Sequence, residues 1–152
     1  MEARMSRPTD VLPDAFHALL QVGKAARAAG LPEPIPTLVH LRASQVNGCS
    51  WCVDMHAKEL RAAGESDERI FCVAAWREAP YYTDAERAAL ALTESVTRLA
   101  DRPDPVPDEV WDEAARHFDE KALAGLLFEI ATINVWNRLN VATRQVANYQ
   151  HP

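Results

Sequence analysis

Prolines and glycines divide this 152-residue chain into segments whose apolar residues recur at helical spacing. The alternation of apolar and polar residues that marks a half-buried strand is absent, and Ala is abundant in most segments. The ten prolines fall almost entirely between these segments, where they interrupt helices. Because a chain of this length is typical of one domain, the sequence predicts a single all-α domain, residues 1–152, built as a bundle of about six or seven helices.

Seven segments carry helical signals. Gly30 follows the first as a helix stop, and Thr83 with Glu86 forms a capping box that opens the fifth. The last segment is apolar on more than one side, so we expect it to be central in the fold or shared with a second subunit. The predicted helices cover about residues 14–29, 38–47, 49–64, 66–76, 83–99, 108–118 and 121–146.

Charge and hydropathy exclude several classes of function. The chain has 16 Lys and Arg against 22 Asp and Glu, a net charge of −6, which argues against nucleic acid and against an anionic membrane surface as partners. No apolar stretch follows Arg4 and Arg7, so no secretory signal is expected. The most apolar region, Ala122 to Trp136, is interrupted by polar residues such as Glu129 and is too short to span a bilayer. We expect a cytoplasmic protein.

Cys49, Cys52 and His56 form the most informative motif. Their spacing places all three side chains on one face of a helix, with Cys52 and His56 one turn apart. Gly48 marks the helix start, where the macrodipole favours a thiolate at Cys49, whereas His56 can accept the proton of Cys52. The motif therefore holds a nucleophilic thiol, a base, and a second thiol that can convert a sulfenic acid into a disulfide, which are the groups that a thiol peroxidase needs.

Three other interpretations of this motif remain. A zinc site would need a fourth ligand, for which His117 and Cys72 are isolated candidates, so no metal site is predicted. A purely structural disulfide is disfavoured in a reducing compartment, and the odd number of cysteines also argues against it. In the third interpretation, the cysteines are small buried hydrophobes and the histidine is a surface residue.

The run LRASQVNGCSWCVDMH, residues 41–56, closely resembles the signature of the carboxymuconolactone decarboxylase family, in its alkylhydroperoxidase D-like branch. Residues 82–94 resemble the next long helix of the family and residues 133–140 part of its C-terminal helix, so the similarity spans about residues 36–144. It implies an all-α fold, a homo-oligomer that is often a trimer or a hexamer, and hydroperoxide reduction without metal, haem or flavin.

The resemblance also assigns roles by position. It makes Cys52 the peroxidatic thiol, Cys49 the resolving thiol, and His56 the base that activates Cys52. It further implies that an external dithiol, of the lipoyl or thioredoxin type, reduces the resulting disulfide. The residues themselves leave open which thiol is the more acidic, because the helix terminus favours Cys49 and the imidazole favours Cys52.

One position departs from the family pattern. The family's proton relay includes a glutamate twelve residues before the first cysteine, and this chain has Thr37 there. A hydroxyl can form hydrogen bonds but cannot take up a net proton at neutral pH. His40, on the same helix face as Thr37, and Glu59, three residues after His56, are candidate replacements.

The sequence thus predicts an antioxidant thiol peroxidase that reduces alkyl hydroperoxides. The alternative is a non-catalytic or slow protein that uses the same redox-active disulfide as a switch, which Thr37 favours. Carboxymuconolactone decarboxylation is less favoured, because that branch of the family generally lacks the cysteine pair. The polar residues of the last predicted helix, Asn134, Asn137, Arg138 and Asn140, are expected to form a structural network or a subunit contact.

Overall fold

The computed structural model describes residues 2–101 and 103–147, and these form helices and turns without any β-strand. The all-α prediction is confirmed. Residue 1, residue 102 and residues 148–152 of the predicted domain lie outside the described residues. The helices are α1 (Pro8–Val11), α2 (Pro13–Arg27), α3 (Ile35–Asn47), α4 (Ser50–Ala62), α5 (Asp67–Cys72), α6 (Asp84–Thr97), α7 (Asp108–His117) and α8 (Glu120–Thr143), with single 3₁₀ turns η1 (Val73–Ala75) and η2 (Leu99–Asp101).

The seven predicted helices correspond to α2 to α8, with small differences at their ends. The capping box at Thr83 and Glu86 is present and opens α6. The last helix ends at Thr143 rather than near Val146, because Arg144 adopts a left-handed conformation with φ 55°. The sequence did not predict α1, since its four residues are too few to show a periodicity.

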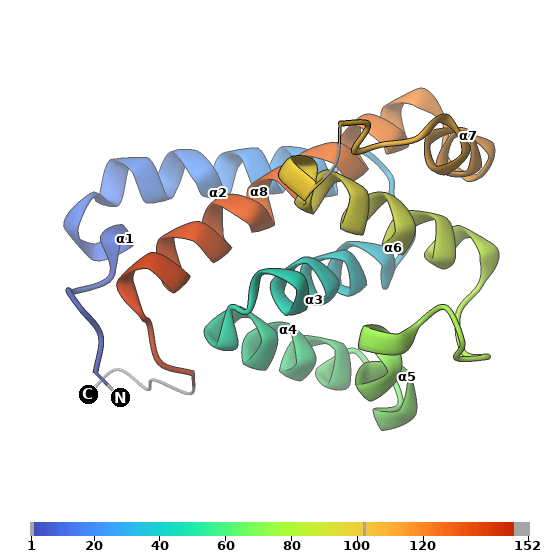
Figure 1. Ribbon diagram of the computed structural model, residues 1–152. Coiled ribbons are helices and arrows are strands. Elements are labelled where there is room, and N and C mark those ends of the chain that lie inside the picture. Colours follow the sequence, from blue (N-terminus) through green and yellow to red (C-terminus); the bar gives the residue numbers. More distant parts are fainter. Residues whose placement is uncertain (1, 102, 148–152) are drawn as a thin grey trace.

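Helix α3 lies at the centre of the molecule, between α4 on one side and the neighbouring helices α2 and α8 on the other (Figure 1). Helix α6 packs against α3, and α7 packs against α6. Helix α8 contacts α2, α3, α4, α6 and α7, which explains why it is apolar on several sides. None of the described helices combines the length and apolar character that a membrane span requires.

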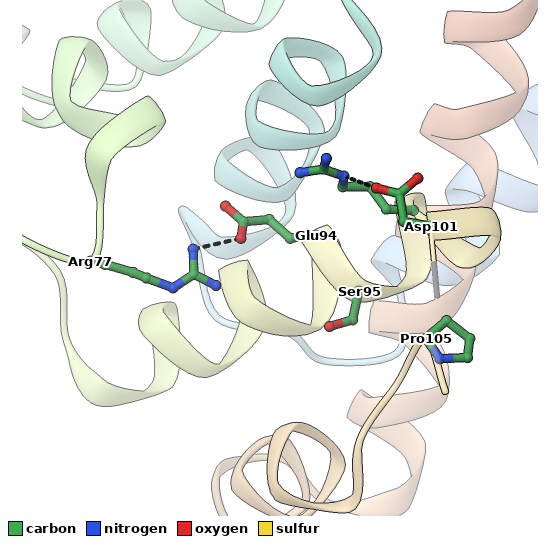
Figure 2. Close-up of a pocket in the computed structure, with 6 residues that line it drawn as sticks. Arg77, Glu94, Ser95, Asp101 and Pro105 are labelled. Carbon is green, nitrogen blue, oxygen red and sulfur yellow. Dashed lines mark hydrogen bonds and ion pairs between the residues drawn. The ribbon is translucent and has the colours of Figure 1, made fainter. Parts of the chain in front are cut away.

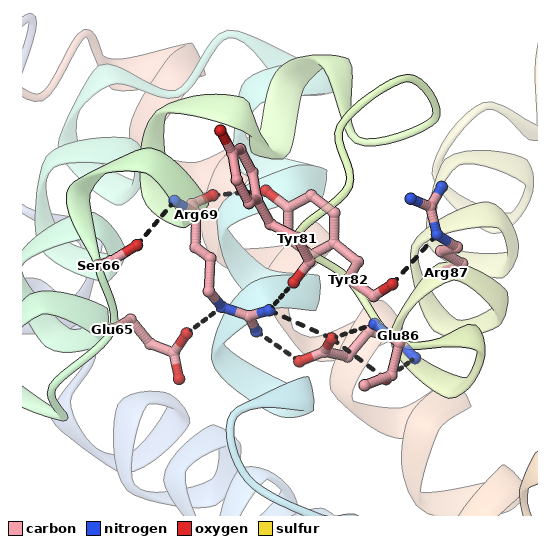
Figure 3. A network of polar contacts seen from close by, with 8 residues as sticks. Glu65, Ser66, Arg69, Tyr81, Tyr82, Glu86 and Arg87 are labelled. Carbon is pink, nitrogen blue, oxygen red and sulfur yellow. Dashed lines mark hydrogen bonds and ion pairs between the residues drawn. The ribbon is translucent and has the colours of Figure 1, made fainter.

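Two ion-pair networks join α6 to its neighbours α3 and α5. Glu94 of α6 accepts hydrogen bonds from Arg42 of α3, at 2.7 Å, and from Arg77, at 2.6 Å. Figure 2 shows Arg77 reaching Glu94 beside a surface pocket of about 240 Å³ that neither the cysteine motif nor its histidine lines. In Figure 3, Arg69 of α5 lies between Glu65 and Glu86 and thereby ties α5 to the start of α6.

Helices α2 and α8 approach each other closely at Gly125. A Cβ atom at this position would lie 2.4 Å from the Cβ of Ala29 and 3.1 Å from the carbonyl oxygen of Ala26. Glu129 follows one helical turn later on the same face of α8. The glycine therefore lets the C-terminal end of α2, which carries Arg27, come within reach of Glu129.

We expect Gly125→Ala to lower the free energy of unfolding, because the added methyl group would overlap Ala29. Overpacking typically costs about 1–3 kcal/mol, more than the roughly 1 kcal/mol that Ala gains over Gly within a helix. Gly23→Ala in α2 is the matched control, since a Cβ there meets nothing within 4 Å, and it should be neutral or stabilising. Urea denaturation of both variants tests this, and a Gly125→Ala protein as stable as the wild type would contradict it.

Candidate functional site

A tight turn between α3 and α4 positions the two cysteines. Helix α3 ends at Gly48, whose left-handed conformation, φ 67°, is one that glycine adopts without strain. The chain then enters α4 at once, with the N–H of Cys49 donating to the carbonyl oxygen of Ser44 at 3.0 Å. Cys49 is the N-cap of α4, immediately before its first helical residue, which agrees with its predicted place near the N-terminal end of this helix.

The structure joins Cys49 and Cys52 in a disulfide, with their Cα atoms 5.4 Å apart. The sulfur of Cys49 also accepts a hydrogen bond from the backbone N–H of Cys52, at 3.3 Å. Both residues are buried, with exposed fractions of 2% and 1%. The third cysteine, Cys72, has a free thiol and is partly buried against a different apolar cluster.

A small apolar cluster encloses the disulfide. Ala43 of α3 and Ile133 of α8 are buried with the cysteines, and the partly buried rings of Trp51 and Trp136 pack against this group. Asn140 of α8 donates a hydrogen bond from its amide nitrogen to the sulfur of Cys52, at 3.4 Å. The pair is thus shielded by side chains of three helices.

His56 lies one turn after Cys52 on α4 and is also buried. Its Nδ1 is 2.7 Å from a carboxylate oxygen of Glu59, and this hydrogen bond is the main reason why the pKa of Glu59 is lowered. Because an ionised carboxylate can only accept, Nδ1 of His56 donates, which leaves the other ring nitrogen, Nε2. That Nε2 is buried and has no hydrogen-bond partner in the described part of the chain.

His40 of α3 contacts His56, with the ring centroids 4.9 Å apart and the planes tilted by 58°. Its Nε2 is 2.7 Å from a carboxylate oxygen of Glu129 on α8. Burial lowers the pKa of His40; the hydrogen bond with Glu129 opposes this effect and the neighbouring His56 adds to it. Like Nε2 of His56, Nδ1 of His40 is buried and lacks a hydrogen-bond partner among the described residues.

Glu129 is the residue whose role the sequence analysis missed. Its side chain is almost fully buried, and its second oxygen lies 3.6 Å from Nε of Arg27, at the end of α2. The signal was present as an isolated acidic residue in the most apolar stretch of the chain. Such a residue argues against a membrane span, but when it is buried its carboxylate also requires a partner.

Thr37 does not face the imidazoles through its hydroxyl. In the described part of the chain, Oγ1 of Thr37 accepts a hydrogen bond from Arg27 at 3.4 Å, and Arg27 also pairs with Glu33 at 2.9 Å. Of the predicted relay candidates, His40 and Glu59 therefore lie at His56, whereas Thr37 lies at Arg27.

Asn134, Asn137 and Arg138 of α8 take part in a polar network, as predicted, whereas Asn140 bonds to the sulfur of Cys52. Asn47 of α3 donates to the amide oxygens of Asn134, at 3.0 Å, and Asn137, at 2.8 Å. Asn137 in turn donates to the hydroxyl of Ser44 at 3.0 Å. These bonds fix α8 against the end of α3, next to the turn that carries Cys49.

The arrangement combines a disulfide-bonded sulfur pair with two adjacent imidazoles. Each imidazole has one nitrogen held by a carboxylate and one nitrogen free. Among residues 2–101 and 103–147, no three His, Cys, Asp or Glu side chains are grouped so that they could hold a metal ion. The chemistry available from these residues is thiol oxidation, disulfide exchange and proton transfer.

Comparisons with known proteins agree with this fold and motif. The sequence model of the carboxymuconolactone decarboxylase family matches residues 13–95. The chain is 34% identical, over 133 residues, to the uncharacterised protein YdfG of Bacillus subtilis (strain 168), covering 88% of this chain and 89% of YdfG.

Two similar solved structures extend the comparison. The first is ATU0492 from Agrobacterium tumefaciens, a protein of unknown function with a suggested role as the antioxidant defence protein AhpD. It has 34% sequence identity and a TM-score of 0.90, covering 98% of this chain and 100% of that one. The second is the debrominase Bmp8, which shares the fold with a TM-score of 0.81 at 23% sequence identity. The match covers 92% of this chain and 74% of the Bmp8 chain.

The buried His40 makes stability depend on pH. An unfolded histidine titrates near pH 6.5, and the pKa of His40 in the folded chain is lower. Between these two values the unfolded chain binds more protons, so the free energy of unfolding rises with pH and falls on acidification. We expect His40→Gln, which can still donate to Glu129, to flatten this slope. Urea denaturation at a series of pH values between neutral and mildly acidic tests the prediction, and equal slopes in both proteins would contradict it.

Proposed function

The chain belongs to the carboxymuconolactone decarboxylase family, and we propose that it is a thiol-dependent reductase of hydroperoxides. The observation that supports this most directly is the free Nε2 of His56, one helical turn from a cysteine that forms a disulfide with its neighbour. The similar protein ATU0492, with its suggested antioxidant role, supports the same class of activity.

The first half-reaction oxidises Cys52. In the reduced protein, Nε2 of His56 accepts the proton of the Cys52 thiol, which leaves a thiolate and an imidazolium. The thiolate attacks the terminal oxygen of the hydroperoxide, ROOH, and the O–O bond breaks. Cys52 becomes a sulfenic acid, and the imidazolium of His56 returns its proton to the leaving alkoxide, so that the products are the sulfenic acid and ROH.

The second half-reaction restores the enzyme. The thiol of Cys49 attacks the sulfenic sulfur of Cys52 and releases water, which gives the disulfide present in the structure. An external dithiol then exchanges with this disulfide, regenerates the two thiols and leaves as a disulfide itself. The half-exposed carboxylate of Glu59 lies between His56 and solvent and provides a route for protons.

Both half-reactions require access to buried sulfur. The rings of Trp51 and Trp136 pack against the disulfide, and Trp136 is itself held edge-on by Phe16, with ring centroids 5.9 Å apart. Movement of these partly buried rings would expose the cysteines that they cover. The proposal also includes a homo-oligomer in the cytoplasm, where a reducing pool would supply the dithiol.

A redox switch is the second candidate. The burial of the disulfide and the presence of Thr37 at the relay position both favour slow oxidation. In that case the disulfide would form over minutes and alter assembly or partner binding, without rapid turnover of peroxide. The rate of the first half-reaction separates the two candidates.

Stopped-flow measurement of thiol oxidation by cumene hydroperoxide tests the proposal. We expect the reduced wild type to react roughly 10²- to 10⁴-fold faster than free cysteine at neutral pH, the usual range for assistance by a positioned acid–base group. Cys52→Ser should lose this acceleration. Cys49→Ser should keep the first step and accumulate a sulfenic acid, but lose turnover with a dithiol.

Cys72→Ser is the matched control, because Cys72 is outside the disulfide, and it should react like the wild type. A wild-type rate no faster than that of free cysteine would refute the enzyme and leave the switch. Rapid oxidation that persists in Cys52→Ser and disappears in Cys49→Ser would reverse the two thiol roles.

A further inference from the structure

We infer that His40 and Glu129 form a second functional pair in this site, in which the free nitrogen of His40 binds the O–H group of the hydroperoxide and Glu129 fixes the orientation of His40. This inference rests on the proposed function and specifies its substrate class. It assigns His40 as a further catalytic residue and Glu129 as a positioning residue, in place of the glutamate that the family pattern has at Thr37.

The first observation is the pair of free nitrogens. Nδ1 of His40 and Nε2 of His56 are both buried, both lack a hydrogen-bond partner among the described residues, and belong to rings in contact. Burying a polar atom without a partner is unfavourable, and most buried polar groups in proteins are satisfied. Two such atoms on adjacent rings indicate a place where a small protic molecule binds.

The second observation is the hydrogen-bonding character of these nitrogens. Each ring is held by a carboxylate at its other nitrogen, His40 by Glu129 and His56 by Glu59, each at 2.7 Å. Since the carboxylates accept, both held nitrogens donate. The lowered pKa of His40 leaves a lone pair on its free nitrogen, and the proposed proton transfer from Cys52 requires one on the free nitrogen of His56. The two rings therefore need two donors, while Oε1 of Glu129, which likewise has no hydrogen-bond partner among the described residues, lies 3.6 Å from Nε of Arg27.

The proposed reaction supplies these two donors. The thiol of Cys52 donates to His56, and the hydroperoxide donates its O–H to His40. A hydroperoxide carries this hydrogen on the oxygen that the thiolate attacks, so His40 would hold that oxygen in place. His40 gains no net proton in this step; the proton that reaches the alkoxide still comes from His56, and the oxygen bound by His40 becomes the hydroxyl of the sulfenic acid.

Burial keeps His40 suited to this role. Its pKa is lowered mainly by desolvation, so the ring remains a neutral acceptor near neutral pH. Arg27 lies 3.6 Å from the outer oxygen of Glu129 and so holds that carboxylate in position. Glu94 of α6 pairs with Arg42, and Arg42 lies on a different side of α3 from His40. The charge of Glu94 is therefore directed away from His40. The charged or titratable groups around His40 are Arg27 from α2, His56 and Glu59 from α4, and Glu129 from α8.

The test compares two reagents on one thiol. In a Cys49→Ser, Cys72→Ser background, Cys52 reacts with cumene hydroperoxide, which has an O–H donor, and with iodoacetamide, which needs only the thiolate. We expect His40→Gln, which keeps a donor to Glu129 but loses the ring nitrogen, to slow the hydroperoxide reaction roughly 10- to 100-fold, a typical effect of a misplaced substrate. Alkylation by iodoacetamide should stay within about twofold of the parent rate, because the imidazole of His56 that activates the thiolate is retained.

For Glu129, the test must include a measurement that would not change if the residue only stabilised the fold. Glu129→Gln should slow the hydroperoxide reaction in the same selective way, and Glu129→Asp should restore part of the rate. Nitrogen-15 NMR of the imidazoles should show His40 protonated at Nε2 in the parent and redistributed between its two tautomers in Glu129→Gln. His117→Gln and Glu113→Gln are matched controls, because they form a similar histidine–glutamate pair on α7, at 2.9 Å, away from the cysteines.

The outcomes separate this inference from the function on which it rests. If the parent reacts with cumene hydroperoxide no faster than free cysteine, the proposed function fails and this inference with it. If the parent reacts rapidly with cumene hydroperoxide and the His40 and Glu129 variants react at the same rate, only this inference fails and the proposed function stands. Equal loss towards both reagents would also overturn it, because His40 would then act on the thiolate or on the fold and not on the hydroperoxide.

Discussion

A buried carboxylate between helices is the constraint on which the rest of this structure depends. Glu129 is 1% exposed, and a charge so far from water must be paired. Its partners come from two other helices, His40 from α3 and Arg27 from α2. Helix α8 must therefore pack against both α2 and α3 near Glu129, and Gly125 allows the close approach to α2. This pairing fixes the ring of His40 beside that of His56.

The position of the cysteine motif depends on the turn between α3 and α4. Because Gly48 takes a left-handed conformation, α4 begins immediately after α3 ends, and Cys49 becomes the cap of the new helix. Cys52 and His56 then follow one turn apart on a short, rigid segment. His56 is buried, whereas its partner Glu59 is half-exposed, so this pair connects the interior of the site to the surface.

Much of the fold could be predicted from the sequence. Helices α2 to α8 were all expected from their apolar periodicity, with prolines marking some of their limits and Gly48 and Gly64 marking others. The capping box of α6 was identified from Thr83 and Glu86 alone, because both of its hydrogen bonds are local. Helix α1 was missed because four residues show no periodicity. The cysteine–histidine motif was found because all its members lie within eight consecutive residues.

The sequence by itself determined the local features: helix spans, caps, and the spacing that places two cysteines and His56 within about two turns at the start of α4. It could not show which distant residues complete the site, since His40 and Glu129 are 89 positions apart and meet only when α3 packs on α8. Nor could it show that Thr37 faces Arg27. Helical spacing fixes which residues share a face, but the tertiary packing of the helices decides what that face contacts.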